Sequence, residues 1–202
     1  MLNQRILNFK ALGIRENLMI PYLKEHTDVP VQRVIDPTLL LTAEDYESII
    51  AESQLEEKYI LLYSRRYSPK MEEYAEQLAK EEGLKIVDIS LRAVNAEKGH
   101  IMRYDAGVEE FLSLIKHAEY IVTNSFHGMI FSVQFRRPFV VFSREQCDNK
   151  IEEILSLIGL CDRILIEGTE QFKPIDYDEV HKRIGIARND SLDFLKMELG
   201  LL

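Results

Sequence analysis

Short apolar runs alternate with amphipathic stretches through the middle of the chain. Residues 58–63 form an apolar, β-rich run, and Ser68 and Pro69 follow it in positions typical of a helix N-cap and first turn. Apolar side chains then recur at the three- and four-residue spacing of one helix face, and Gly83 is typical of a helix C-cap. This part of the sequence therefore predicts a strand followed by a helix.

The same alternation continues towards residue 166. Further strands are predicted at 84–89, 119–123, 138–142 and 163–166. Further helices are predicted at 108–116, 125–137 and 148–158, and the second of these is apolar on nearly every side. Repeated strand–helix alternation favours a parallel sheet with helices on both faces, because parallel strands need crossover connections. The predicted fold class is therefore α/β, with a Rossmann-like parallel sheet.

The two ends of the chain have different patterns. At the front, strands are expected at 11–15 and 33–35, and helices at 17–25 and from 42 to about 53, the last opening with a capping-box sequence. Residues 176–199 have helical spacing with an interruption near 189–191, which predicts one or two closing helices. We therefore divide the chain into a remnant of a preceding α/β unit with a linker (1–54), a Rossmann-like domain (55–170) and closing helices (171–202).

The composition narrows the class of protein. The 202-residue chain is 46% hydrophobic and has no low-complexity tract, so it has enough apolar residues for a packed core. Its 25 basic and 34 acidic residues give a net charge of −9, which argues against nucleic-acid binding because such surfaces are basic. A local basic pocket for a small anion remains compatible with this charge.

Cysteine and targeting signals are sparse. Cys147 and Cys161 lack the paired spacing of a zinc site or a disulfide framework, so no metal site is expected. The first residues lack the apolar core of a signal peptide, and no apolar run approaches the roughly 18 residues of a membrane span. We expect a cytoplasmic protein, either free or peripheral at the inner face of the membrane.

The most informative segment runs from Thr123 to Gly128, where a predicted strand ends and a buried helix begins. In open parallel sheets ligands bind beyond the carboxyl ends of the strands, and a helix N-terminus there offers N–H groups to a phosphate or carboxylate. His127 is placed to donate a hydrogen bond or carry a proton, and Gly128 allows a close approach. The alternative is structural: Ser125 caps the helix and His127 packs in a polar interior.

Five separated motifs occur in one order along the chain. They are Gly13–Glu16, Asp36–Leu41, Gly107–Ala118, Thr123–Gly128 with Phe131-Ser132 and Pro138-Phe139 after it, and Asn149–Arg163. In this order they resemble the polysaccharide pyruvyl transferase family, and the resemblance runs from about residue 10 to 195. Gly13, Val108 and Lys150 stand where that family usually has Ser, Pro and Arg.

The resemblance implies transfer of a pyruvyl group from phosphoenolpyruvate (PEP) to sugar hydroxyls as a ketal, in the biosynthesis of a cell-surface polysaccharide or exopolysaccharide. It also implies a fold like the C-terminal half of a glycosyltransferase B-type architecture. PEP is the donor substrate, no cofactor is implied, and the acceptor is a sugar or a lipid-linked saccharide. His127 is then the candidate general acid or a donor to the anion. The same motif implies substrate-binding roles for Asn124, Ser125, Phe126 and Gly128.

Three arginines are candidates for binding the anionic donor. Arg15 lies at the end of a predicted strand, where its guanidinium can pair with a carboxylate or phosphate, and the alternative is an ion pair with Glu16. Arg65 and Arg66 follow a predicted strand and are expected either to line the same mouth or to be solvated loop residues. Asp36, which precedes a proline, is expected to fix a turn.

Two other functions remain open. One is a related glycosyltransferase that uses a nucleotide sugar, because a fold does not fix a function. The other is a catalytically incomplete binding or assembly module, since most of the family's N-terminal domain is missing from these 202 residues. For the same reason we expect the chain alone to have little pyruvyl transfer activity, and to pair with a second copy or with a separate chain that supplies the missing half.

Overall fold

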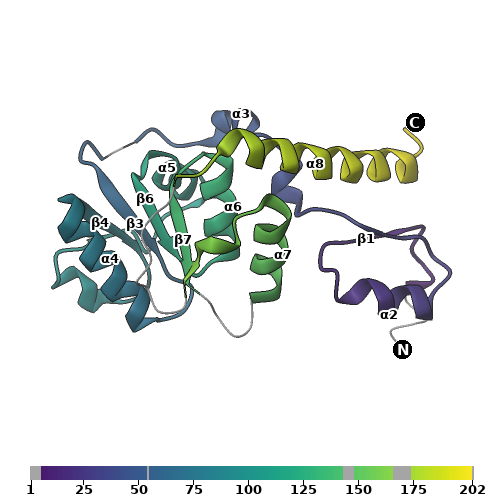
Figure 1. Cartoon of the computed structure of the whole chain (residues 1–202). Helices are drawn as coiled ribbons and strands as arrows, with labels where there is room; N and C mark the ends of the chain where they lie inside the picture. The colour runs from purple at the N-terminus through teal and green to yellow at the C-terminus, as the bar shows by residue number, and fades with distance from the viewer. Residues whose placement is uncertain (1–5, 54, 143–147, 166–173, 202) are drawn as a thin grey trace.

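The computed structural model describes residues 6–53, 55–142, 148–165 and 174–201. Within them a large unit contains a six-stranded sheet with the strand order β5-β4-β3-β6-β7-β8 (Figure 1). The strands are β3 (Tyr59–Tyr63), β4 (Lys85–Ile89), β5 (Ile101–Met102), β6 (Tyr120–Thr123), β7 (Phe139–Phe142) and β8 (Ile164–Leu165). Every neighbouring pair is parallel, so the predicted α/β fold with a Rossmann-like sheet is confirmed.

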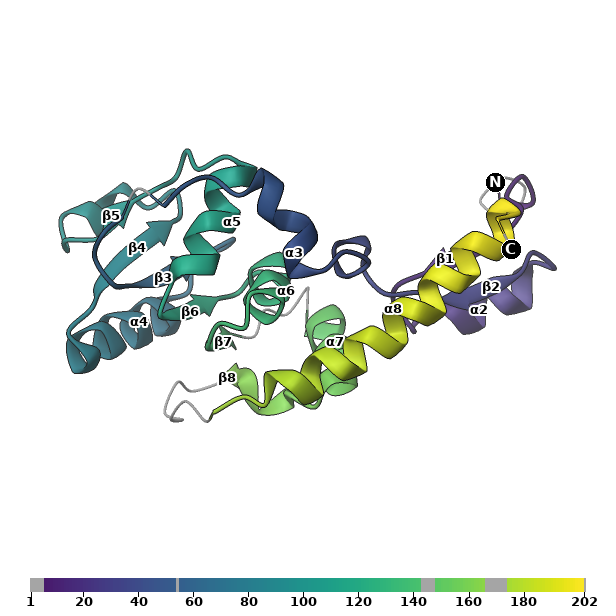
Figure 2. The same ribbon diagram turned by 90° about the horizontal axis from the view of Figure 1, so that it is seen from above.

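Helices cover both faces of this sheet (Figure 2). They are α4 (Pro69–Glu82) on one face and α5 (Val108–His117), α6 (Phe126–Gln134) and α7 (Asp148–Ile158) on the other. Side chains alternate along β3: Ile60 and Leu62 pack in the core that contains α4, whereas Tyr59 and Leu61 pack in the core that contains α5 and α6. Because β3 is buried from both sides, its sequence is a continuous apolar run instead of an alternating one.

The front of the chain forms a small unit beside the large one. It contains β1 (Leu12–Ile14) and β2 (Val31–Arg33), which pair in parallel, and α2 (Met19–His26). A linker follows with η1 (Pro37–Leu39), α3 (Ala43–Tyr46) and η2 (Glu47–Ile49), where η denotes a 3₁₀ helix. The last helix, α8 (Tyr177–Leu199), runs from the large unit to the small one, as both views show (Figures 1 and 2).

The closing segment is one helix, and the interruption predicted near residues 189–191 is absent from it. The Ser191 hydroxyl donates to the Ala187 carbonyl at 2.8 Å and accepts from the Ile35 amide at 3.0 Å. Serine side chains often weaken an isolated helix by bonding to its backbone, but here the Ser191 hydroxyl bonds both to its own helix and to the backbone next to the small unit. These contacts keep the helix continuous where the local sequence predicts an interruption.

Two other elements differ from the prediction. The capping box of Thr42 and Asp45 is confirmed, but the helix it opens ends at Tyr46, and further on the Ala51 amide donates to the Glu109 carbonyl at 3.1 Å. Between β4 and α5, where the sequence predicts no element, the chain contains η3 (Ala93–Ala96) and β5, which are too short to leave a periodic pattern. The predicted domain boundaries at 54–55 and 170–171 touch segments outside the described residues and stay predictions.

Candidate substrate site

The candidate segment lies where β6 ends and α6 begins, at the carboxyl edge of the sheet. Ser125 is the N-cap of α6, and its hydroxyl accepts a hydrogen bond from the Gly128 amide at 3.3 Å. His127 is exposed, whereas the other residues of α6 are buried. Helix geometry gives the amides of Phe126 and His127 no acceptor within the helix. The first turn of α6 thus combines an exposed imidazole with two amides that the helix itself does not use.

Gly128 brings α6 close to the sheet. A side chain at this position would place its Cβ 2.6 Å from the Thr123 hydroxyl oxygen and 2.9 Å from the ring of Tyr63. Thr123 donates to the Tyr63 carbonyl at 2.8 Å and accepts from the Ser125 amide at 3.0 Å. The close approach expected at Gly128 therefore occurs between the helix and the sheet. Ser125 caps α6, which is the structural alternative that the sequence left open.

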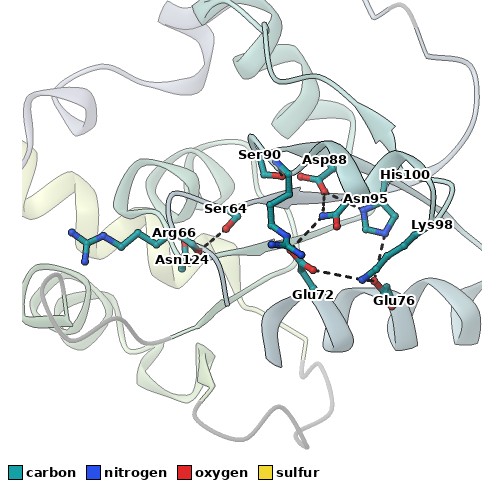
Figure 3. Close-up of polar contacts among 11 residues, drawn as sticks. Ser64, Arg66, Glu72, Glu76, Asp88, Ser90, Asn95, Lys98, His100 and Asn124 are labelled. Carbon is teal, nitrogen blue, oxygen red and sulfur yellow. Dashed lines mark hydrogen bonds and ion pairs between the residues drawn. The ribbon is translucent and has the colours of Figure 1, made fainter. Parts of the chain in front are cut away.

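Asn124 connects this segment to the loop after β3. Its side chain is buried, and Oδ1 accepts from the Arg65 amide at 2.8 Å while Nδ2 donates to the Arg66 carbonyl at 2.7 Å. Arg65 and Arg66 are both exposed at the edge of the sheet. Figure 3 shows the Arg66 side chain extending away from the polar group around Glu72. Asn124 is a positioning residue, because it holds the loop that carries both arginines and does not itself face outward.

Arg15 comes from the end of β1 and lies against α6. Its guanidinium carbon is 5.1 Å from the centre of the Phe126 ring, and the His127 ring centre is 5.4 Å from the same point. The guanidinium donates to Glu16 Oε1 from Nε at 3.0 Å and from Nη2 at 2.7 Å, and it also donates to Asp36 Oδ2. The expected alternative for Arg15, an ion pair with Glu16, is present at the edge where the anion site is expected.

Four of the five motifs meet around Arg15. Asp36 is buried, and its Oδ1 accepts from the Thr38 amide at 3.0 Å and the Thr38 hydroxyl at 2.7 Å, which fixes the turn that the sequence predicts. Glu16 Oε1 also lies 3.2 Å from Lys150 Nζ of α7. Lysine supplies a single point charge at this position, without the forked donors of an arginine. Both carboxylates therefore have a second partner besides Arg15.

The charges around Arg15 make the stability of this site depend on pH. Burial opposes ionisation of Asp36 and Glu16, but hydrogen bonds from Thr38 and Arg15 to the first, and from Arg15 and Lys150 to the second, outweigh it and lower the pKa of both carboxyls. Their ordinary values are 3.8 and 4.5, so the stabilisation is complete above about pH 5 and is lost as the pH falls through the lowered pKa values.

We expect the free energy of unfolding to fall between pH 6 and pH 3 less steeply in an Arg15→Met variant than in the wild type. The variant lacks the guanidinium that lowers both pKa values, whereas carboxyls elsewhere contribute equally to both proteins. Urea denaturation across this range measures both slopes. Equal slopes would show that Arg15 does not hold the two carboxylates in solution.

A second basic feature, which sequence reasoning missed, lies beside the segment. A pocket of about 440 Å³ opens at the carboxyl ends of β3 and β4, and Arg92 lines it together with Arg65 and Arg66. Arg92 stands three residues beyond the end of β4, as Arg66 stands three residues beyond the end of β3. The signal that pointed to Arg66, an arginine just after a buried strand, was therefore also present at Arg92.

Within the described ranges, no group of three or more His, Cys, Asp or Glu side chains is arranged to hold a metal ion. In the same part of the chain, no helix combines the length and apolar character needed to cross a bilayer.

A family model for polysaccharide pyruvyl transferases matches residues 1–146. This span runs from before β1 to beyond β7 and contains the whole of α6, and so it includes Arg15, Asp36 and His127. The chain belongs to the polysaccharide pyruvyl transferase family. A comparison with curated proteins gave no match.

Two solved structures of UDP-GlcNAc 2-epimerase from Methanocaldococcus jannaschii are similar in fold. One, in complex with UDP-GlcNAc and UDP, has a TM-score of 0.52 and 17% identity, and the similarity covers 89% of this chain and 54% of that one. The other has a TM-score of 0.52 and 15% identity, over 89% and 55% of the two chains. This member of the pyruvyl transferase family thus spans about half the length of those proteins. The likeness confirms a fold that resembles half of a glycosyltransferase B-type architecture.

Proposed function

We propose that the protein transfers the pyruvyl group of PEP to sugar hydroxyls as a ketal, in the biosynthesis of a cell-surface polysaccharide. The observation that carries this proposal is the meeting of Arg15 and His127 at the ring of Phe126, at the N-terminus of a buried helix. Two cationic or hydrogen-donating side chains from distant motifs thus lie at the carboxyl edge of the sheet, together with the backbone amides at the start of α6 that have no acceptor within the helix.

PEP carries a carboxylate and a phosphate, and both need positive or N–H donor partners. The amides of the first turn of α6 and the His127 imidazole supply donors on one side, and Arg15 supplies a forked guanidinium. Arg15 can replace one of its bonds to Asp36 or Glu16 with a bond to PEP at a small cost in free energy. Thr38 continues to bond Asp36, and Lys150 continues to bond Glu16, so neither carboxylate is left unpaired.

The reaction needs a proton at the methylene carbon of PEP. His127 in its protonated form donates it, which converts the enol phosphate into an oxocarbenium-like centre. A sugar hydroxyl attacks that carbon and loses its proton, and the phosphate then departs with the electron pair of its C–O bond. Loss of the phosphate regenerates an oxocarbenium-like centre, and a second hydroxyl of the same sugar attacks it and loses its proton, which closes the ketal. Of the two protons released by the hydroxyls, one restores the protonated His127 and the other is taken up by the departing phosphate. The products are the pyruvyl ketal and inorganic phosphate.

Calorimetric titration with PEP tests the donor half of this proposal without requiring turnover. We expect His127→Ala to bind PEP about tenfold more weakly or worse, because a charge-assisted hydrogen bond is lost. His117→Ala is the matched control: His117 is also an exposed histidine, but it lies at the end of α5, at the opposite edge of the sheet.

Equal PEP affinity in the wild type and in His127→Ala would remove His127 from the site. UDP-sugars are titrated in parallel, because binding of a nucleotide sugar without binding of PEP would favour a glycosyltransferase. Phosphate release from PEP with a panel of saccharide acceptors then measures the transfer itself.

A further inference from the structure

The pocket between the ends of β3 and β4 is basic in a chain with a net charge of −9. Arg65, Arg66 and Arg92 line it, and no acidic residue is among its described lining residues. Its volume of about 440 Å³ falls in the range of small-molecule sites. Tyr67 and Tyr104, which are 56% and 67% exposed, add aromatic surface. Such a lining suits an anion that also carries a bulky apolar or flat group.

Arg92 is fixed in this pocket by a buried carboxylate. Its Nε lies 2.8 Å from Glu72 Oε1, and its guanidinium carbon lies 3.7 Å from the centre of the Tyr67 ring. Glu72 is only 3% exposed and belongs to the polar group drawn in Figure 3. In that group Asn95 Nδ2 donates to Glu72 at 3.3 Å and to Asp88 at 2.7 Å. An arginine held in this way loses little conformational freedom when an anion binds.

Arg92 is paired with Glu72 but stays open towards the pocket. Lys98 Nζ lies 3.6 Å from the other oxygen of Glu72 and 2.6 Å from Glu76 Oε1, so Lys98 is paired chiefly with Glu76. The Arg92 side chain is 32% exposed and remains within reach of a ligand. The pocket keeps a positive field because Arg65 and Arg66 line it beside Arg92, whereas Glu72 is not among its lining residues.

Arg65 reaches the pocket from the neighbouring strand. Its backbone is held by Asn124, so the loop that carries it has a defined position. Arg65 lines the pocket from the loop after β3 and Arg92 from the loop after β4, whereas the Arg66 side chain extends away from the Glu72 side (Figure 3). Two cations on separate loops match a ligand with two phosphoryl groups better than one with a single anionic group.

We propose that this pocket binds the diphosphate of a diphosphate-linked saccharide, which is the acceptor of the pyruvyl group. The inference rests on the proposed function, in which PEP occupies the adjoining edge at His127. The saccharide is carried either by a nucleoside diphosphate or by a polyprenyl diphosphate. Both carriers present the same diphosphate ester to Arg65 and Arg92.

Titration with inorganic pyrophosphate, UDP and farnesyl diphosphate tests this site. We expect the wild type to bind pyrophosphate and at least one ester, and the tighter ester identifies the carrier. Arg92→Ala and Arg65→Ala should each weaken binding about ten- to a hundredfold, through the loss of charge-assisted hydrogen bonds. Arg136→Ala is the control, because this exposed arginine follows α6 at the opposite edge of the sheet. Arg92→Lys keeps a cation beside Glu72 and separates loss of binding from loss of folding.

PEP is titrated separately and again in the presence of saturating pyrophosphate. Arg92→Ala should leave PEP binding unchanged, and pyrophosphate should not displace PEP. The pocket proposal is wrong if no diphosphate probe binds, if both arginine-to-alanine variants bind like the wild type, or if PEP and pyrophosphate displace each other. Pyrophosphate binding without PEP binding counts against the proposed function alone and leaves the diphosphate site standing.

Discussion

Replacing Gly128 by Ala is expected to destabilise the protein by about 1–3 kcal/mol. The new Cβ would lie 2.6 Å from the Thr123 hydroxyl oxygen, and Thr123 is fully buried. Thr123 cannot turn away without breaking its hydrogen bonds to the Tyr63 carbonyl and the Ser125 amide. α6 must therefore move off the sheet, which lowers the free energy of unfolding and displaces His127 from the edge.

Gly185 of α8 provides the matched control for this substitution. No atom lies within 4 Å of a Cβ built there, and Ala is favoured over Gly inside a helix by about 1 kcal/mol. Urea denaturation of Gly128→Ala and Gly185→Ala should thus give changes of opposite sign. A Gly128→Ala protein as stable as the wild type would show that α6 does not pack against β6 as described.

Replacing Asn124 by Asp is expected to destabilise the protein by on the order of 3 kcal/mol at neutral pH. The change buries a negative charge and removes the Nδ2 group that donates to the Arg66 carbonyl. The carboxylate keeps an acceptor for the Arg65 amide, but its second oxygen then faces the Arg66 carbonyl at a site that is 1% exposed. The deficit relative to the wild type should shrink as the pH is lowered, since a neutral carboxyl regains a donor for that carbonyl.

Asn189→Asp is the control for the added charge, because Asn189 is exposed on α8. It should change the free energy of unfolding little at any pH. Chemical denaturation of both variants at two pH values gives the comparison. If Asn124→Asp behaves like Asn189→Asp, the loop of Arg65 and Arg66 is not held by residue 124.

The large unit could be predicted because its strands and helices carry strong local patterns. The apolar run correctly predicted that β3 ends at Tyr63, and Gly83, which has a left-handed backbone, correctly predicted the end of α4. β5 escaped prediction because two residues cannot show a period, and the interruption expected in α8 was wrong because Ser191 finds partners outside its own helix. Local preference decides an element only where tertiary contacts do not oppose it.

The sequence predicted where His127 and Arg15 lie in the fold, but not that Arg15 pairs with Asp36. Motif order and a strand–helix junction pointed to His127 and Arg15, and both lie at one edge. That Arg15 would satisfy Asp36 as well as Glu16 depends on how the small unit meets α6, which no local pattern encodes. Substrate contacts stay predictions for all of the candidate residues, and Asn124, Ser125 and Gly128 also have internal roles in the structure.

Because α8 is one unbroken helix, the direction in which its far end faces the small unit is fixed by the direction in which its near end faces the large unit. Val180 and Ile184 sit in the core of the large unit, whereas Ser191 contacts Ile35 beside the small one. A helix turns about 100° per residue, so a single inserted residue between Ile184 and Ser191 would swing the distal contacts a quarter-turn or more away from their partners. β1 would follow them, and Arg15 with it. The geometry at Phe126 is therefore set partly by the number of residues in a helix that never touches the substrate edge. A change close to a whole number of turns, such as about seven residues, would preserve the facing of both ends.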